Sequence, residues 1–201
     1  MKRLDRIGAA IFDYLLVAVL IAVSFFLVLP FLTVLTGAVA WFQASGDERD
    51  LALLFRSIRA HWKKSLPYGV ALFLITGIAA LDIAFFRQNA YPGSDLVLAL
   101  SWIAVVLAFV TIVNGPTILN RMAVTLPQLV YDAFVLAIAS PLDFLAAAAF
   151  HGVIVAAAIL APALAIPLSA PLLWIAARFS LHAFHRLESK QNPHNSGGKN
   201  V

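Results

Sequence analysis

The sequence predicts an all-α protein, a polytopic transmembrane helical bundle of about six spans with an amphipathic interfacial helix on its cytoplasmic side. Three observations lead to this fold class. Of the 201 residues, 62% are hydrophobic and 12% are charged, whereas a soluble domain carries about 25% charged residues. The mean hydropathy is +0.92. The apolar residues also fall into several stretches near the roughly 20 residues that cross a bilayer, which excludes a soluble core with one anchor.

Five stretches qualify as spans by length, and they form a single transmembrane domain over residues 1–187. They cover residues 7–29, 66–86, 95–119, 141–161 and 167–184. Residues 188–201 form a polar tail that we expect to be disordered, because it is rich in Asn, Ser and Gly. A cleaved signal peptide is the competing interpretation of the N-terminus, since Ala38-Val39-Ala40 has the form of a cleavage site. The apolar run before it exceeds the roughly 7–15 residues of a signal core, so we expect the first span to be retained.

Residues 31–44 form a shorter apolar segment whose crossing is decided by charge rather than by length. At about 1.5 Å per residue it reaches roughly 21 Å of a hydrocarbon core of about 30 Å. If the segment crosses, 13 of the 14 Lys and Arg residues lie on one side of the membrane, and Arg87 alone lies on the other. If it does not, the cations of residues 49–64 lie opposite the N-terminus, against the positive-inside bias. We therefore predict a multi-pass protein of the inner membrane with six crossings and both termini in the cytoplasm.

Residues 47–64 show the pattern of an amphipathic helix. One apolar stripe is expected from Leu51, Leu54, Phe55, Ile58 and Trp62, with Arg49, Arg56, Arg59 and Lys63 on the other side. Asp47 is the expected N-cap, and Pro67 is expected to restart the chain as a new helix. Such a helix either lies on the cytoplasmic leaflet with its cations toward anionic lipid or docks a protein partner.

A second surface helix is expected before the fifth span. Thr125 and Gln128 have the spacing of a capping box, and Pro127 suits the first turn of a helix. Ser140-Pro141 then marks the start of the next span.

The segment LPFLTVLTGAVAWF, with Pro30 and Thr33, is followed by the polar break GDERD and by LLFRSIRAHWKKSLPYG. Together with the later stretch LPQLVYDAFVLAIASPLDF, this pattern resembles the YesL-like family of small bacterial membrane proteins, a domain of unknown function. The chain has Leu35-Thr36-Gly37 where a Gly-Pro-Ala type step is expected. The resemblance implies an α-helical inner-membrane protein associated with carbohydrate uptake and breakdown. It implies no reaction and no catalytic residues.

The sequence contains none of the usual signatures of catalysis or nucleotide binding. It has no GxxxxGK, GxGxxG, HExxH or GxSxG motif, and its lack of cysteine excludes disulfides, thiolate metal sites and iron–sulfur clusters. We therefore expect no enzyme activity, no cofactor and no catalytic or metal-binding residues. The basic pI of about 9.7 reflects cations placed beside apolar spans, so it indicates topology and not a nucleic-acid partner.

Ionisable residues within the spans are the remaining candidates, because charges are costly in lipid. Asp82 and Asp143 lie near span ends, where solvent can reach them. Asp13 and Arg178 lie at similar depth, so they either pair or Arg178 extends toward the interface. His151 is expected to bond a neighbouring helix, with a proton relay or ligand contact as the alternative.

His182, His185 and Glu188 recur every three residues at the end of the last span. Two imidazoles and a carboxylate on one helical face match a metal-ligand set. A cationic interface anchor with Arg186 is the favoured interpretation.

These observations leave competing functions. The first is a non-enzymatic accessory or regulatory component that contacts the lipid bilayer and carbohydrate transporter subunits. The second is a small transporter or channel in its own right, which would require a homo-oligomer because six crossings are few for a carrier. A membrane-embedded enzyme ranks third, since no convergent acid, base or nucleophile is evident.

Overall fold

The computed structural model describes residues 11–21, 31–44, 50–89 and 91–191, and these residues form helices joined by short connections. The helices are Ile11–Ile21, α2 (Phe31–Gln43), α3 (Leu51–Gln88), α4 (Ser94–Arg121), α5 (Leu126–Ala139), α6 (Pro141–Leu160) and α7 (Pro162–Gln191). The all-α prediction is confirmed for this part of the chain. Within it, α3, α4, α6 and α7 are long and apolar enough to cross a membrane.

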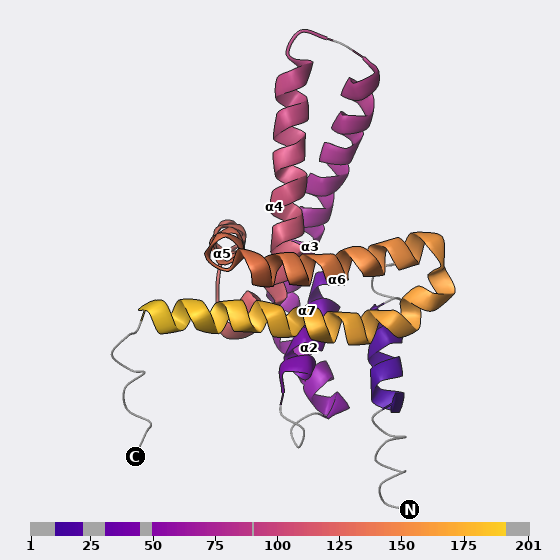
Figure 1. Ribbon diagram of the computed structural model, residues 1–201, viewed down its shortest axis with the longest axis vertical. Coiled ribbons are helices and arrows are strands. Elements are labelled where there is room, and N and C mark those ends of the chain that lie inside the picture. The colour runs from indigo at the N-terminus through magenta and orange to yellow at the C-terminus, as the bar shows by residue number, and fades with distance from the viewer. Residues whose placement is uncertain (1–10, 22–30, 45–49, 90, 192–201) are drawn as a thin grey trace, which may run out of the picture.

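Two long helices, α3 and α4, form a hairpin that projects from the rest of the molecule (Figure 1). Gly93 closes the turn between them with φ of 87°, a left-handed conformation that glycine adopts without a Cβ penalty. Large apolar side chains along the hairpin are exposed, among them Phe73, Ile78 and Leu100. An exposed apolar surface of this kind is what a helix surrounded by lipid presents.

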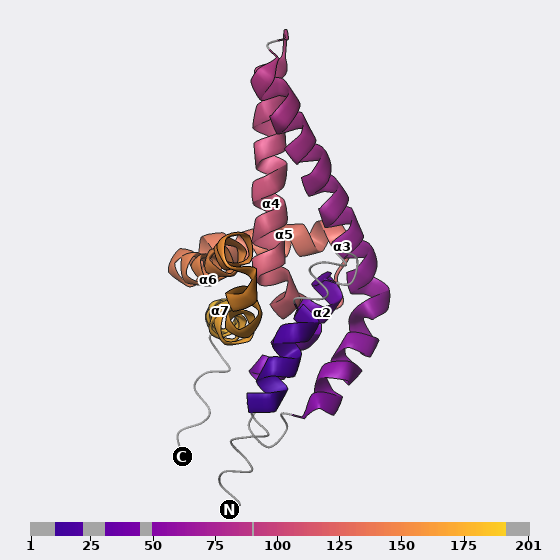
Figure 2. The same ribbon diagram turned by 90° about the vertical axis from the view of Figure 1, so that its right-hand side faces the viewer.

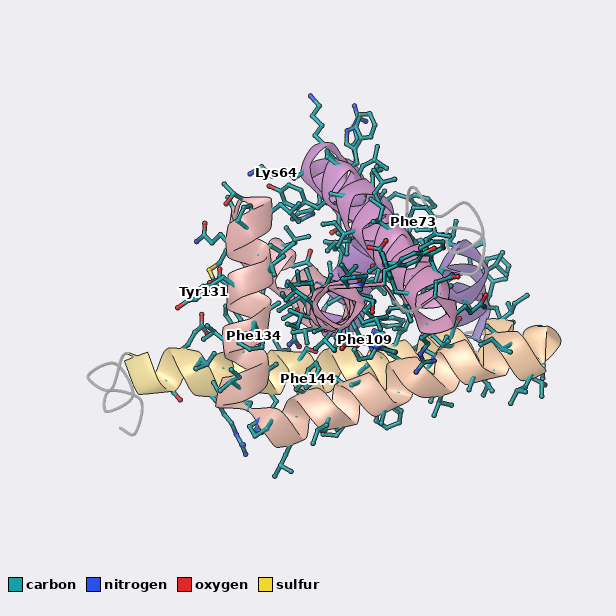
Figure 3. The ribbon with its side chains drawn as sticks, turned by 90° about the horizontal axis from the view of Figure 1, so that it is seen from above. Lys64, Phe73, Phe109, Tyr131, Phe134 and Phe144 are labelled. Carbon is teal, nitrogen blue, oxygen red and sulfur yellow. The ribbon has the colours of Figure 1, made fainter. Side chains whose placement is uncertain are left out.

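The second hairpin, α6 and α7, crosses the first one steeply. The two helices lie side by side in Figure 1 and are seen nearly end-on in Figure 2, while α4 runs vertically in both views. From above, α5 in turn crosses the direction of α6 and α7, and Tyr131 projects outward from it (Figure 3). The two long hairpins do not share one axis, so they do not both run along a single bilayer normal in this arrangement. The count of six crossings therefore stays a prediction.

The predicted break between an interfacial helix and the next span is wrong, because α3 runs without interruption from Leu51 to Gln88 with Pro67 inside it. Proline is tolerated within membrane helices where side chains satisfy the freed backbone groups. Ser65 is fully buried, and its Oγ lies 2.8 Å from the carbonyl oxygen of His61 and 2.9 Å from Thr33 Oγ1. Figure 2 shows that α3 bends along its length. The predicted N-cap Asp47 lies outside the described residues, and Asp50 occupies the N-cap position.

The predicted apolar stripe of α3 is only partly buried. Leu54 is 0% exposed, but Phe55 is 52% and Trp62 is 48% exposed. The covered face continues instead through Ser57 and Ser65. One short neighbour, α2, covers a narrower strip than the sequence pattern offers, so the two aromatic side chains on the edge of the stripe face outward.

Two further boundaries can be compared with the structure. The last long helix begins at Pro162, not at residue 167, and it encloses Pro167 and Pro171 before ending at Gln191. The remainder of the predicted tail lies outside the described residues. The predicted surface helix is present as α5, with Thr125 at its N-cap, although no side-chain hydrogen bond caps it.

One cluster of the core is built around α2 and contains two large buried aromatic side chains. Trp41 and Phe42 are almost fully buried, and the Tyr14 ring packs edge-on against Trp41 with centroids 5.1 Å apart. Gly37 brings α2 against α3, because an added Cβ would overlap the side chain of Ile58 and lie 3.3 Å from the Leu54 carbonyl oxygen. The α2–α3 contact therefore depends on a residue without a side chain.

We predict that Gly37→Ala destabilises the protein by about 1–2 kcal/mol, because overpacking of about 1–3 kcal/mol outweighs the helix-propensity gain of about 0.5–1 kcal/mol. Gly115→Ala in α4 is the matched control, since an added Cβ there meets its nearest side-chain atom at 3.6 Å, an ordinary contact. The measurement is thermal unfolding of both variants in detergent. A Gly37→Ala protein as stable as the Gly115→Ala protein would contradict the close contact.

Candidate functional site

A single large open pocket lies where α2, the first half of α3, the end of α4, α5 and the end of α7 meet. Its volume is about 1110 Å³, at the upper end of the roughly 300–1,000 Å³ of small-molecule sites. Apolar walls come from Leu53, Ile118, Val135, Leu136, Phe184 and Leu187. The polar lining consists of Gln43, Arg56, Ser57, His61, Asn120, Arg121, Asp132 and Glu188.

Two guanidinium groups line the pocket without a carboxylate partner among the described residues. Arg56 uses its Nε to donate to the carbonyl oxygen of Ala52, one turn earlier in α3, at 3.3 Å. The Arg121 guanidinium lies over the Phe184 ring at 5.5 Å from the centroid. The ion pairs of the described chain involve only other residues. Both arginines therefore present permanent positive charge to a pocket occupant.

The two carboxyl groups of the pocket do not neutralise these cations directly. Glu188 is exposed, and its Oε2 lies 3.3 Å from Nδ1 of His185 on the same helix. Asp132 is half-buried on α5, and burial raises the pKa of its carboxyl above the ordinary value. A raised pKa favours the neutral form, so Asp132 opposes an anion less strongly than an ordinary carboxylate would.

The Ser57 and His61 side chains lie close together in the pocket, but they are not arranged for nucleophilic catalysis. His61 Nδ1 lies 2.9 Å from the Ser57 carbonyl oxygen and 3.4 Å from Ser57 Oγ. A carbonyl oxygen only accepts, so Nδ1 carries the proton of this bond and is not available as a base toward the hydroxyl. The pair therefore serves to fix the imidazole on α3.

Amide side chains hold one wall of the pocket in place. Asn120 Nδ2 donates to the carbonyl oxygen of Thr36 at 2.9 Å, and Gln43 Nε2 donates to Thr117 Oγ1 at 3.4 Å. Both bonds join α2 to α4. The end of α4 that carries Arg121 is therefore positioned by α2.

A second polar cluster joins α6 to α7. Asp143 is 7% exposed, and its Oδ1 lies 3.1 Å from His182 Nδ1, while Oδ2 lies 3.7 Å from Nη1 of Arg186. Oδ2 has no hydrogen-bond partner. Asp143 was predicted to be accessible to solvent. This prediction is wrong, because the contact between α6 and α7 covers the start of α6. The cluster connects two helices.

The other intramembrane candidates do not converge. Arg178 is exposed and lies over the Trp174 ring at 5.6 Å from the centroid, and the ion pairs of the described residues do not join it to Asp13. Asp82 accepts a bond from Ser101 Oγ at 3.4 Å. His151 Nδ1 lies 2.9 Å from the carbonyl oxygen of Ala147 in its own helix, and among the described residues it does not make the expected bond to a neighbouring helix.

The residues considered for a metal site point to different partners. His182 contacts Asp143, whereas His185 contacts Glu188. No group of three or more His, Cys, Asp or Glu residues in the described part of the chain is placed to hold a metal ion.

The pocket itself was missed by the sequence analysis. Arg121 was counted only among the cations that indicate topology, and Asp132 was noted only because it shares a helix face with Gln128. The two residues flank a short connection between α4 and α5, and that local proximity was the one available signal. The approach of α3 and α7 to the same place is a tertiary event without a sequence pattern.

We predict that His182→Ala destabilises the protein by about 1–3 kcal/mol, because it leaves the buried Asp143 carboxylate without its hydrogen bond. His185→Ala is the matched control on the same helix, since its pair with Glu188 is exposed and such pairs contribute about 0–1 kcal/mol. Thermal unfolding in detergent measures both. Equal losses in the two variants would show that the contact with Asp143 adds no stability.

Comparison with known proteins places the chain in no described group. No family model, curated protein or solved structure matches it. The resemblance to the YesL-like family therefore stays a prediction that rests on the residues quoted above.

Proposed function

We propose that this chain is a non-enzymatic accessory or regulatory protein of the inner membrane that binds an anionic group of another membrane component in the pocket. The observation that carries this proposal is that Arg56 and Arg121 line an open pocket with apolar walls and have no carboxylate partner among the residues that the structure describes. The donation from His61 to the Ser57 carbonyl oxygen further supports binding over catalysis. The link to carbohydrate uptake rests on the family resemblance alone.

Membrane insertion of this protein is supported by its four long apolar helices and by their exposed apolar side chains. We propose six crossings with cytoplasmic termini, because the distribution of Lys and Arg follows the positive-inside bias. In this topology the pocket opens to the cytoplasm, since Arg56 and Arg121 belong to the predicted cytoplasmic set. The turn at Gly93 then faces the opposite side.

The topology predicts opposite reporter activities at two sites. A reporter fused at residue 47 should report the cytoplasm, and one inserted in the turn at Gly93 should report the external side. An external signal at residue 47 would exclude six crossings and restore the model with five. Both reporter fusions are made in the same strain, so that a difference in expression level does not account for a difference in reporter activity.

The accessory role predicts that affinity purification from native membranes recovers other membrane proteins with this chain. Recovery should fall by at least about tenfold in the double variant Arg56→Gln with Arg121→Gln, because the loss of even one charged hydrogen bond to the bound group costs about 1.5–3 kcal/mol. The matched control is Arg59→Gln with Lys63→Gln, which removes the same charge from a separate hollow on the outer side of α3. Equal recovery from both variants would contradict the role of the pocket.

The alternative is a small oligomeric transporter or channel. Its candidate path residues are engaged in packing: Asn114 is buried, donates to the Ala133 carbonyl oxygen at 3.2 Å and accepts from Ser180 Oγ at 3.3 Å. Such bonds hold helices together. Recovery of a lone homo-oligomer from native membranes would favour this alternative over the accessory role.

A further inference from the structure

We propose that the anionic group bound in the pocket is the phosphate of an anionic phospholipid, with the headgroup between Arg56 and Arg121 and the start of an acyl chain against the apolar wall. This inference rests on the proposed function, in that it takes the pocket as the binding site. It names the class of ligand that the lining fits.

The charge of the lining selects a phosphate. Arginine presents several N–H donors in a planar fork that matches phosphate oxygens, and basic pockets between membrane helices on the cytoplasmic side bind anionic headgroups. Neither guanidinium is occupied by a carboxylate of the described chain. His61 Nε2 and the exposed Glu188 add hydrogen-bonding groups suited to the polar substituents of a headgroup.

The apolar wall favours a lipid over a soluble phosphate ester. Ile118, Leu136 and Phe184 line the same pocket as the two arginines, and burial of apolar area against them stabilises a hydrocarbon chain by about 25 cal/mol per Å². A soluble phosphate gains nothing from this surface. An acidic protein segment gains less, because its carboxylates lie on short side chains close to a polar backbone.

Two carboxyl groups of the pocket, those of Glu188 and Asp132, oppose a bound anion, and Asp132 is the more buried of the two. Its carboxyl lies in the same pocket as the guanidinium groups and repels a phosphate whenever it is ionised. Removing that charge while keeping the shape, in Asp132→Asn, should therefore strengthen binding of the anion. A variant that binds more tightly cannot be explained by misfolding.

The test uses the purified full-length chain in detergent, with lipid binding measured by native mass spectrometry. Phosphatidylglycerol should bind at least about tenfold more tightly than phosphatidylcholine, whose choline cation opposes the two arginines. Arg56→Gln with Arg121→Gln should weaken phosphatidylglycerol binding about tenfold or more, and Asp132→Asn should strengthen it. Arg59→Gln with Lys63→Gln should leave it unchanged.

Three results would overturn the proposal. Equal binding of the two lipids would exclude charge selection, and equal losses in the two double variants would assign the effect to general surface attraction. Displacement of the lipid by equimolar inorganic phosphate, or by an equimolar synthetic oligoglutamate peptide, would assign the pocket to that class of ligand. Because the assay contains no partner protein, its outcome is independent of whether co-purification succeeds.

Discussion

The close packing of α2 against α3 and α4 is the contact on which the rest of this structure depends. Lipid is as apolar as the helices, so helices associate through close approach and polar bonds, and not through the hydrophobic effect alone. Gly37 allows the close approach to α3. Thr33 contacts Ser65 on α3, and the Thr36 carbonyl oxygen accepts from Asn120 on α4. A helix of 13 residues thereby holds two much longer ones.

The same kind of bond sets the position of α5 and α7. Asn114 of α4 bonds the backbone of α5 and the Ser180 hydroxyl of α7, and the Tyr68 hydroxyl of α3 donates to the Val124 carbonyl oxygen before α5 at 2.9 Å. Together with the contacts of α2, these bonds bring α2, α3, α4, α5 and α7 to one place. The pocket is a consequence of that convergence, because the ends of the segments carry the polar side chains that cannot enter the apolar interior.

The continuity of α3 gives its charged half two different surroundings. Arg56 and His61 face the pocket, whereas Arg59 and Lys63 lie with Phe55 and Trp62 along the outer hollow. Aromatic rings beside cations are typical of a membrane–water interface. One helix thus presents cations both to the open pocket and to its outer surface, so substitutions on its two sides separate the two roles.

The sequence alone determined that the chain is helical and apolar enough to enter a membrane, because composition and the length of apolar stretches are local properties. It also indicated α5, through the turn residues that precede it. The tertiary structure decided which side of each helix is covered: Phe55 and Trp62 belong to the predicted stripe but face outward. It also shows that α3 continues through Pro67. The pocket likewise required the structure, since packing between helices distant in sequence brings Arg56 to the same pocket as Arg121 and Asp132, and packing of that kind leaves no periodic signal in a single chain.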